Sequence, residues 1–284
     1  MVINLGLGEL ARPATVLVEK ISNAIGLMYK PRSIKNIACA QAEADKIRPQ
    51  SEIEIAEIRE NALKRVVYEE VRNQKNINNI VQLACEGLKQ DADASKIDDD
   101  WISHFFDKCK IISNAEMQSL WGRLLSSEAN QPGSISRKTI ELVSGLDKND
   151  AQLFTNFCSF LASDGAGQIF PIILNTDHIL YKSRGINFET LTHLEHLGLI
   201  SFNPVTGFGF DISSQEYMLL YNHYLIKLRF TQLTNNLPTG LALLTRSGKQ
   251  LAPISGYQTT EEILNYFIED FKVKQIHAIT LKIK

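Results

Sequence analysis

Two histidines spaced for one face of a helix are the residues best suited to metal chemistry in this chain. His193 and His196 lie three positions apart in a segment of helical pattern, which would place both imidazoles on one side of a metal ion. The acids nearby are Glu189 and Glu195, and Glu195 points to a different part of the helix surface. Because no further ligand completes the set, we predict that no metal binds here.

The acidic run Asp98–Asp100 is the second candidate for a divalent cation. Adjacent positions at the start of a helix do not converge on one point, so we interpret the run as a helix N-cap and a solvated linker. The sequence contains no GxxxxGK[ST] phosphate loop, no HExxH and no GxSxG. We therefore predict a protein that is not an enzyme and carries no cofactor.

The composition describes a folded protein without a strong overall charge. The 284 residues are 44% hydrophobic and have a formal net charge of −2, so no global field favours nucleic acid or anionic lipid. Four widely spaced cysteines without a CxxC pair indicate free thiols in a reducing cytoplasm. The N-terminus is a poor signal peptide, and no window reaches the roughly 18 apolar residues of a spanning helix. We predict a soluble, cytoplasmic protein.

The segment 1–30 contains an amphipathic helical pattern from residue 14 to residue 29. The apolar face suits packing on the protein itself or on a second subunit, and the basic residues that follow would suit an anionic membrane surface. The face lacks Trp and Phe, which weakens the membrane interpretation. The predicted membrane or partner face consists of Leu17, Ile21, Ile25, Met28, Lys30, Arg32 and Lys35.

Residues 31–90 form a charged helical region in which Glu alternates with Lys and Arg. An apolar stripe of helical period runs through it, and Pro49 would kink or split the helix. Such a long helix supports self-association. An acidic linker then leads to a predicted helical bundle over residues 98–165. Three apolar side chains of helical spacing are expected in the core of this bundle: Trp121, Leu124 and Leu125.

Residues 166–284 change to an α+β pattern. A helix at 188–196 is followed by a strand at 198–202, a turn at Pro204–Gly207 and a strand at 208–212, the order typical of a winged helix. This helix carries no Arg or Lys, which argues against sequence-specific reading of DNA. The predicted fold class is α+β: a long helix and helical bundle, followed by a winged-helix-like, mixed α/β region.

Two segments carry a resemblance to a known family. The run PATVLVEKISNAIGLMYKPRSIKNIACAQAEADKI and the run MQSLWGRLLSSEANQPGSISRKTIELVSGLDKNDAQLF resemble the bacterial domain-of-unknown-function family 2806. The central part is also similar to the Abi-alpha family of abortive-infection proteins, in Leu120-Trp121 with Leu124-Leu125, Leu146-Asp147 and Gly198-Leu199-Ile200. The resemblance covers about the first 165 residues. It implies a role in phage defence and supplies no catalytic residues.

These observations predict a non-enzymatic anti-phage defence protein that acts through protein or membrane-surface contacts. The expected partners are a second copy bound through the long helix, a second defence protein, or an anionic membrane surface with peripheral attachment. The alternative is a nucleic-acid-binding sensor or regulator that uses the winged-helix-like region. Nucleic acid is the less favoured partner because the predicted recognition helix lacks basic residues.

Overall fold

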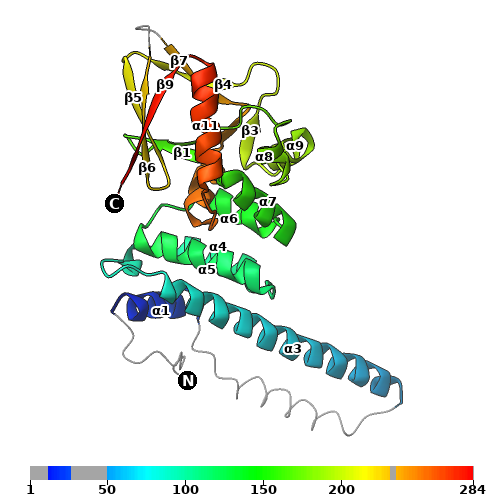
Figure 1. Cartoon of the computed structure of the whole chain (residues 1–284). Coiled ribbons are helices and arrows are strands. Elements are labelled where there is room, and N and C mark those ends of the chain that lie inside the picture. Colours follow the sequence, from blue (N-terminus) through cyan, green and yellow to red (C-terminus); the bar gives the residue numbers. More distant parts are fainter. Residues whose placement is uncertain (1–11, 27–49, 231–234, 284) are drawn as a thin grey trace. The chain divides into compact units, whose positions relative to one another are not determined.

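The chain folds into two compact units, Met1–Ser144 and Gly145–Lys284. The structure is a computed structural model that describes residues 12–26, 50–230 and 235–283. In the described residues the first unit is helical, and the second combines antiparallel strands with helices (Figure 1). The α+β class predicted from the sequence is therefore confirmed. The four segment boundaries given above stay a prediction.

Local capping determines where the helices of the first unit begin. The Asp98 side chain accepts a hydrogen bond from the Trp101 backbone N–H at 2.8 Å, and Asn114 accepts one from Met117 at 3.0 Å. The predicted N-cap role of the acidic run is thus confirmed for Asp98. In its described residues this unit has the helices α1 (Arg12–Ile25), α3 (Gln50–Glu86), η1 (Ala94–Lys96), α4 (Asp99–Cys109), α5 (Ala115–Asn130) and α6 (Arg137–Ser144).

The core of the first unit is built around aromatic side chains from α4 and α5. Trp101 stacks on Phe105, and Phe105 meets Trp121 edge-on, with ring centroids 5.1 Å apart in both pairs. The Trp101 indole N–H donates to the Ile135 carbonyl oxygen at 2.8 Å, so this buried polar group is satisfied. The three side chains predicted for the core are fully buried: Trp121, Leu124 and Leu125.

Helix α3 packs its C-terminal end on α5 at close range. A Cβ at Gly122 would lie 2.7 Å from the Leu83 Cβ, so only glycine allows this approach. A buried amide pair accompanies the contact, because Gln118 Nε2 donates to Asn76 Oδ1 at 3.1 Å and Asn76 Nδ2 donates to the Lys110 carbonyl at 2.8 Å. Both amides therefore find partners in the core.

The second unit is organised around a five-stranded antiparallel sheet with the order β2-β1-β5-β6-β9. Helix α11 lies across one face (Figure 1), where Tyr221 and Phe267 meet with ring centroids 5.3 Å apart. The elements are α7 (Lys148–Cys158), β1 (Leu161–Asp164), β2 (Ile169–Pro171), α8 (Ile179–Lys182), α9 (Phe188–His196), β3 (Ile200–Phe202), β4 (Phe208–Ile212), β5 (Glu216–Tyr221), β6 (Tyr224–Arg229), β7 (Asn235–Gly240), β8 (Ala242–Leu244), α10 (Arg246–Leu251), η2 (Ala252–Ile254), α11 (Glu261–Val273) and β9 (His277–Lys282).

The strand pairing differs from the pairing expected of the predicted winged helix. Strand β3 pairs with β8, and β4 pairs with β7, so the two strands expected to form a wing do not pair with each other. Strands β3 and β4 together form one side of a two-stranded ribbon, and β8 and β7 form the other. The turn between β3 and β4 interrupts the first side. Asn203 holds it, because its side chain accepts from the Val205 and Thr206 backbone N–H groups while its own N–H donates to Leu241.

Gly240 joins this ribbon to the chain that follows β2. The Ile173 N–H donates to the Thr239 carbonyl at 2.9 Å, and the Leu241 N–H donates to the Ile173 carbonyl at 2.8 Å. Gly240 has a φ of +101°, and a Cβ there would lie 1.8 Å from the Ile173 carbonyl oxygen. No other residue type fits this position without moving the backbone.

Candidate functional site

The apolar face of α1 is largely enclosed within its own unit. Leu17 and Ile21 are buried where α1 packs on α4 and η1. Lys20, on the polar side, pairs with Asp99 at 2.6 Å. A membrane role for this face would require α1 to leave the unit. The other predicted members Met28, Lys30, Arg32 and Lys35 lie outside the described residues.

Ile25, the remaining member of that face, is half-buried at the end of α1. It lines a hollow of about 350 Å³ together with Ile77 of α3 and Phe106 of α4. The hollow also has acidic and basic side chains at its margin, among them Glu70 and Lys110. Its walls come from three helices that are distant in sequence, and helical periodicity alone gives no signal for such a hollow.

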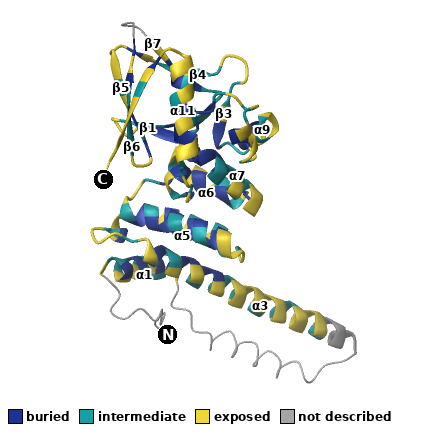
Figure 2. Ribbon diagram, viewed as in Figure 1, coloured by how far each residue is buried: buried dark blue, intermediate teal, exposed yellow. Residues whose placement is uncertain are grey.

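Most of α3 lies away from the core of the first unit. Among the described residues 56–75, called the projecting end from here on, none is buried, whereas Asn76 and Ile77 begin the packed end. Figure 2 shows the exposed surface along this part of the helix. Large apolar side chains on it are strongly exposed: Ile58 at 68%, Val66 at 52%, Tyr68 at 71% and Val71 at 47%.

Charged residues of both signs surround these apolar side chains. Lys64 pairs with Glu60 at 2.7 Å, one turn away on the same helix, and Arg65 reaches Glu69 at 4.0 Å. Between residues 56 and 75 the sequence has four Glu and five Lys or Arg residues, so the local charge is nearly balanced. A helix surface with balanced charge and exposed apolar side chains suits contact with a protein better than contact with an anionic membrane.

The two helical histidines do not converge on one point. His193 Nε2 lies 2.6 Å from the Asp150 carboxylate of α7, and His196 Nδ1 lies 3.1 Å from the Thr192 carbonyl on its own helix. Within the described part of the chain no group of three His, Cys, Asp or Glu side chains is placed to hold a metal ion. The imidazoles therefore serve contacts within the unit.

The acidic run at the start of α4 is engaged in local ion pairs. Asp98 and Asp100 lie 3.7 and 3.9 Å from the guanidinium of Arg137, and Asp99 pairs with Lys20. Asp98 and Asp100 thus share Arg137, Asp99 meets Lys20, and all three lie at the helix N-terminus, where negative charge is favourable. Their arrangement matches a cap and a solvated linker.

The described cysteines are poorly placed for nucleophilic chemistry. Burial raises the pKa of the Cys109 and Cys158 thiols well above its usual value, and burial is also the main cause of the raised pKa of Cys85. All three are free thiols. A thiol with a raised pKa is a weak nucleophile at neutral pH, since the thiolate is the reactive form. Cys39 lies outside the described residues.

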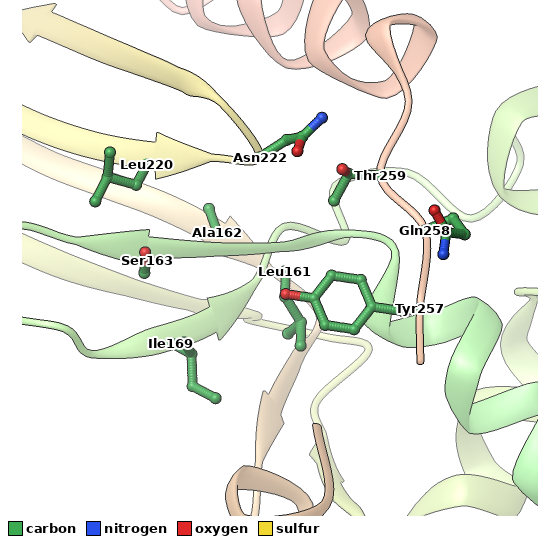
Figure 3. Close-up of a pocket in the computed structure, with 9 residues that line it drawn as sticks. All are labelled: Leu161, Ala162, Ser163, Ile169, Leu220, Asn222, Tyr257, Gln258 and Thr259. Carbon is green, nitrogen blue, oxygen red and sulfur yellow. The ribbon is translucent and has the colours of Figure 1, made fainter. Parts of the chain in front are cut away.

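A pocket of about 430 Å³ opens in the second unit where β1 and β5 separate (Figure 3). Asn222, with a φ of 56°, turns the chain from β5 to β6 at one side, and Tyr257 reaches in from the loop before α11. Burial is the first cause of a raised pKa for Tyr257. The lining residues are Leu161, Ala162, Ser163, Ile169, Leu220, Asn222, Tyr257, Gln258 and Thr259.

None of these nine side chains carries a formal charge. Hydroxyl and amide groups offer hydrogen bonds beside aliphatic walls, so the pocket can accept an uncharged polar group. It offers no carboxylate, imidazole or thiol for general acid–base or nucleophilic work. Sequence reasoning missed this pocket because its walls come from positions about a hundred residues apart in the chain, without a shared motif.

The comparison with family models places this chain among known sequences. The model described as protein of unknown function (DUF2806) matches residues 60–268. This chain belongs to the DUF2806 family. The match includes most of the projecting end and nearly all of the second unit, so it extends well beyond the 165 residues expected from sequence reasoning.

The DUF2806 match also leaves out the first of the two runs on which the resemblance was based, since that run ends at Ile47. Comparisons with curated proteins and with solved structures return no match. None of these comparisons shows the predicted likeness to the Abi-alpha family. Among the described helices of this DUF2806 protein, none is long and apolar enough to cross a membrane.

Proposed function

We propose that this DUF2806 protein is a non-enzymatic component of anti-phage defence that acts by binding another protein through the projecting end of α3. One observation carries the proposal: a helical stretch without a buried side chain keeps Ile58, Val66, Tyr68 and Val71 exposed to solvent. Large apolar side chains at such exposure mark protein-interaction surfaces. The defence role rests on the likeness to abortive-infection proteins that was predicted from the sequence alone.

A protein partner fits this surface better than a membrane. The projecting end carries both charge signs in nearly equal number, whereas binding to anionic lipid depends on an excess of Lys and Arg. The apolar face of α1, the other candidate for lipid contact, has Leu17 and Ile21 buried. The partner is a second copy of this chain or a second defence protein, and both would use the helix-to-helix packing that a long exposed helix allows.

The test is a plaque assay on cells that express the chain, challenged with a panel of phages. Val66→Asp adds a charge to the proposed contact and should abolish protection without altering the fold. Asn61→Asp adds the same charge at an exposed, already polar position of the projecting end and should leave protection intact. Circular dichroism establishes that both variants fold.

The possible outcomes separate the parts of the proposal. Full protection by Val66→Asp overturns the role of the projecting end, and lack of protection by the unaltered chain overturns the defence role. If the chain co-sediments with anionic vesicles and loses this binding when residues 1–30 are deleted, the partner is a membrane and not a protein. Binding to DNA or RNA that weakens steeply with salt would favour the nucleic-acid sensor instead.

A further inference from the structure

Strand β9 forms one edge of the five-stranded sheet and, apart from the charge of Lys282, lacks the usual protections of an edge. It pairs with β6 over His277–Lys282 in continuous register without a bulge, and among the described strands none pairs with its other side. The strand contains neither Pro nor Gly. Natural proteins normally shorten, bulge or charge such an edge, since its unpaired backbone groups template the addition of another strand.

On the side of β9 that faces away from α11, the side chains that follow His277 are apolar and exposed. Ile279, Leu281 and Ile283 alternate along the strand with exposed fractions of 38, 56 and 46%. They continue an apolar row across the sheet, because Leu281 lies beside Leu225, which pairs with Leu220. An alternating apolar row that ends at an open edge would gain from continuing into a further strand.

The hydrogen-bond pattern identifies which backbone groups of β9 point away from β6 and have no backbone partner among the described strands. The Ile283 N–H donates to the His223 carbonyl, so residues 283, 281, 279 and 277 direct their backbone groups toward β6. The intervening residues Ala278, Thr280 and Lys282 therefore direct theirs to the open edge. Each of these residues presents its N–H and C=O as a pair to the open edge, at every second position of the strand.

We propose that β9 pairs antiparallel with β9 of a second copy of this chain, about a two-fold axis at Thr280. In this register Thr280 faces Thr280, and Ala278 faces Lys282, so each outward-directed residue meets an outward-directed residue of the second copy. Ile279 then lies beside Leu281 of the second copy on the exposed apolar face. The two five-stranded sheets become one continuous sheet.

Charge placement agrees with this register. Lys282, the cation of the strand, lies opposite Ala278 and not opposite another Lys282, so no like charges face each other across the pair. Its ammonium group sits 5.5 Å from the centre of the Tyr224 ring on its own sheet, which keeps it off the edge. The ammonium thus does not obstruct a strand approaching from outside.

The surface involved is one strand edge and three apolar side chains from each copy. This is small beside the roughly 1,600 Å² of a standard protein interface. We therefore expect a weak dimer that forms with increasing concentration. The pairing is independent of the projecting end of α3, so the proposed function and this inference can fail separately.

Sedimentation velocity of the full chain over a wide concentration range tests the proposal. The unaltered chain should shift from monomer to dimer. Thr280→Pro removes an outward N–H while leaving the bonds to β6, and Leu281→Lys places a cation on the shared apolar face. Each should raise the dimer dissociation constant about tenfold or more.

Two matched controls keep the test specific to the edge. Thr280→Val preserves the N–H and the β-branched shape, and Met218→Lys adds the same charge at an exposed apolar residue of the same face, away from the edge. Both should dimerise as the unaltered chain does. Three outcomes would overturn the proposal. The unaltered chain could stay monomeric, Leu281→Lys and Met218→Lys could weaken the dimer equally, or Val66→Asp could abolish all self-association. If Thr280→Pro does not fold, the dimer dissociation constant of Leu281→Lys still tests the proposal.

Discussion

The two ends of α3 carry similar apolar side chains and meet opposite surroundings. At the packed end Ile80 and Ala84 are fully buried against α5, while at the projecting end Ile58 is 68% exposed. The apolar period runs through both. The difference lies in the neighbouring helix, because α5 has Gly122 where a Cβ would lie 2.7 Å from the Leu83 Cβ of α3. A helical pattern thus identifies the helix but does not tell which of its turns are covered.

The largest effect on stability is expected from a substitution that removes a buried side chain at the packed end of α3. Ile80→Ala should lower the free energy of unfolding by about 2 to 5 kcal/mol, since it removes a fully buried side chain and leaves a cavity. Ile58→Ala, the same change at the projecting end, should stay within about 0.5 kcal/mol. Urea unfolding followed by tryptophan fluorescence measures both, because Trp101 and Trp121 lie in the first unit.

Equal losses for the two variants would break the comparison. They would mean that Ile58 is packed in solution, either on its own unit or on a second copy. Repeating the measurement at several protein concentrations separates these cases, since stability that depends on a second copy rises with concentration.

A smaller loss of stability is expected from a substitution that adds a methyl group between α5 and the packed end of α3. In Gly122→Ala the new methyl group would meet the Leu83 Cβ at 2.7 Å and the Ala84 backbone nitrogen at 3.3 Å. Overpacking costs about 1 to 3 kcal/mol, and the better helix propensity of Ala returns roughly 0.5 to 1 of it. The same fluorescence measurement should therefore show a net loss smaller than that of Ile80→Ala.

The control for this variant is Asn61→Ala at the projecting end. It also improves helix propensity but meets solvent, so its unfolding free energy should be unchanged or slightly higher. A stabilised Gly122→Ala would show that α3 and α5 separate without cost, which contradicts the close packing of the two helices.

Sequence reasoning succeeded where the determinants are local. The N-cap at Asp98 and the burial of Trp121 follow from residues within one or two helical turns of each other. The α+β class follows from the change of periodicity near residue 165. For these features the chain carries the relevant signal within a short window.

It failed where a partner strand is distant in sequence. The segments 200–202 and 208–212 look like two strands of a hairpin, yet they pair with residues 242–244 and 235–240. Gly240 could have given a hint, because a glycine inside a strand often marks a close backbone approach. The pocket beside Tyr257 escaped for the same reason, since its walls meet only after the sheet has formed.

The smallest expected effect concerns the second unit, where a similar contrast separates the covered and open faces of the sheet. Tyr217 of β5 donates a hydrogen bond to the Asp164 carboxylate at 3.1 Å. Burial first, and then this carboxylate, raise the pKa of Tyr217 to about 12. An unfolded tyrosine ionises near pH 10.

The raised pKa means that the folded chain holds this proton more tightly. Its stabilising contribution is fully present below pH 10 and is lost as pH rises through about 12, because the unfolded chain releases the proton first. Tyr217 is only partly buried, so screening by solvent limits the effect to below about 1 kcal/mol. Urea unfolding followed by circular dichroism at pH 9 and pH 11 should show a smaller loss in Tyr217→Phe than in the unaltered chain. An identical loss in both would mean that Tyr217 is as solvated in the folded chain as in the unfolded one, and that this edge of the covered face is open.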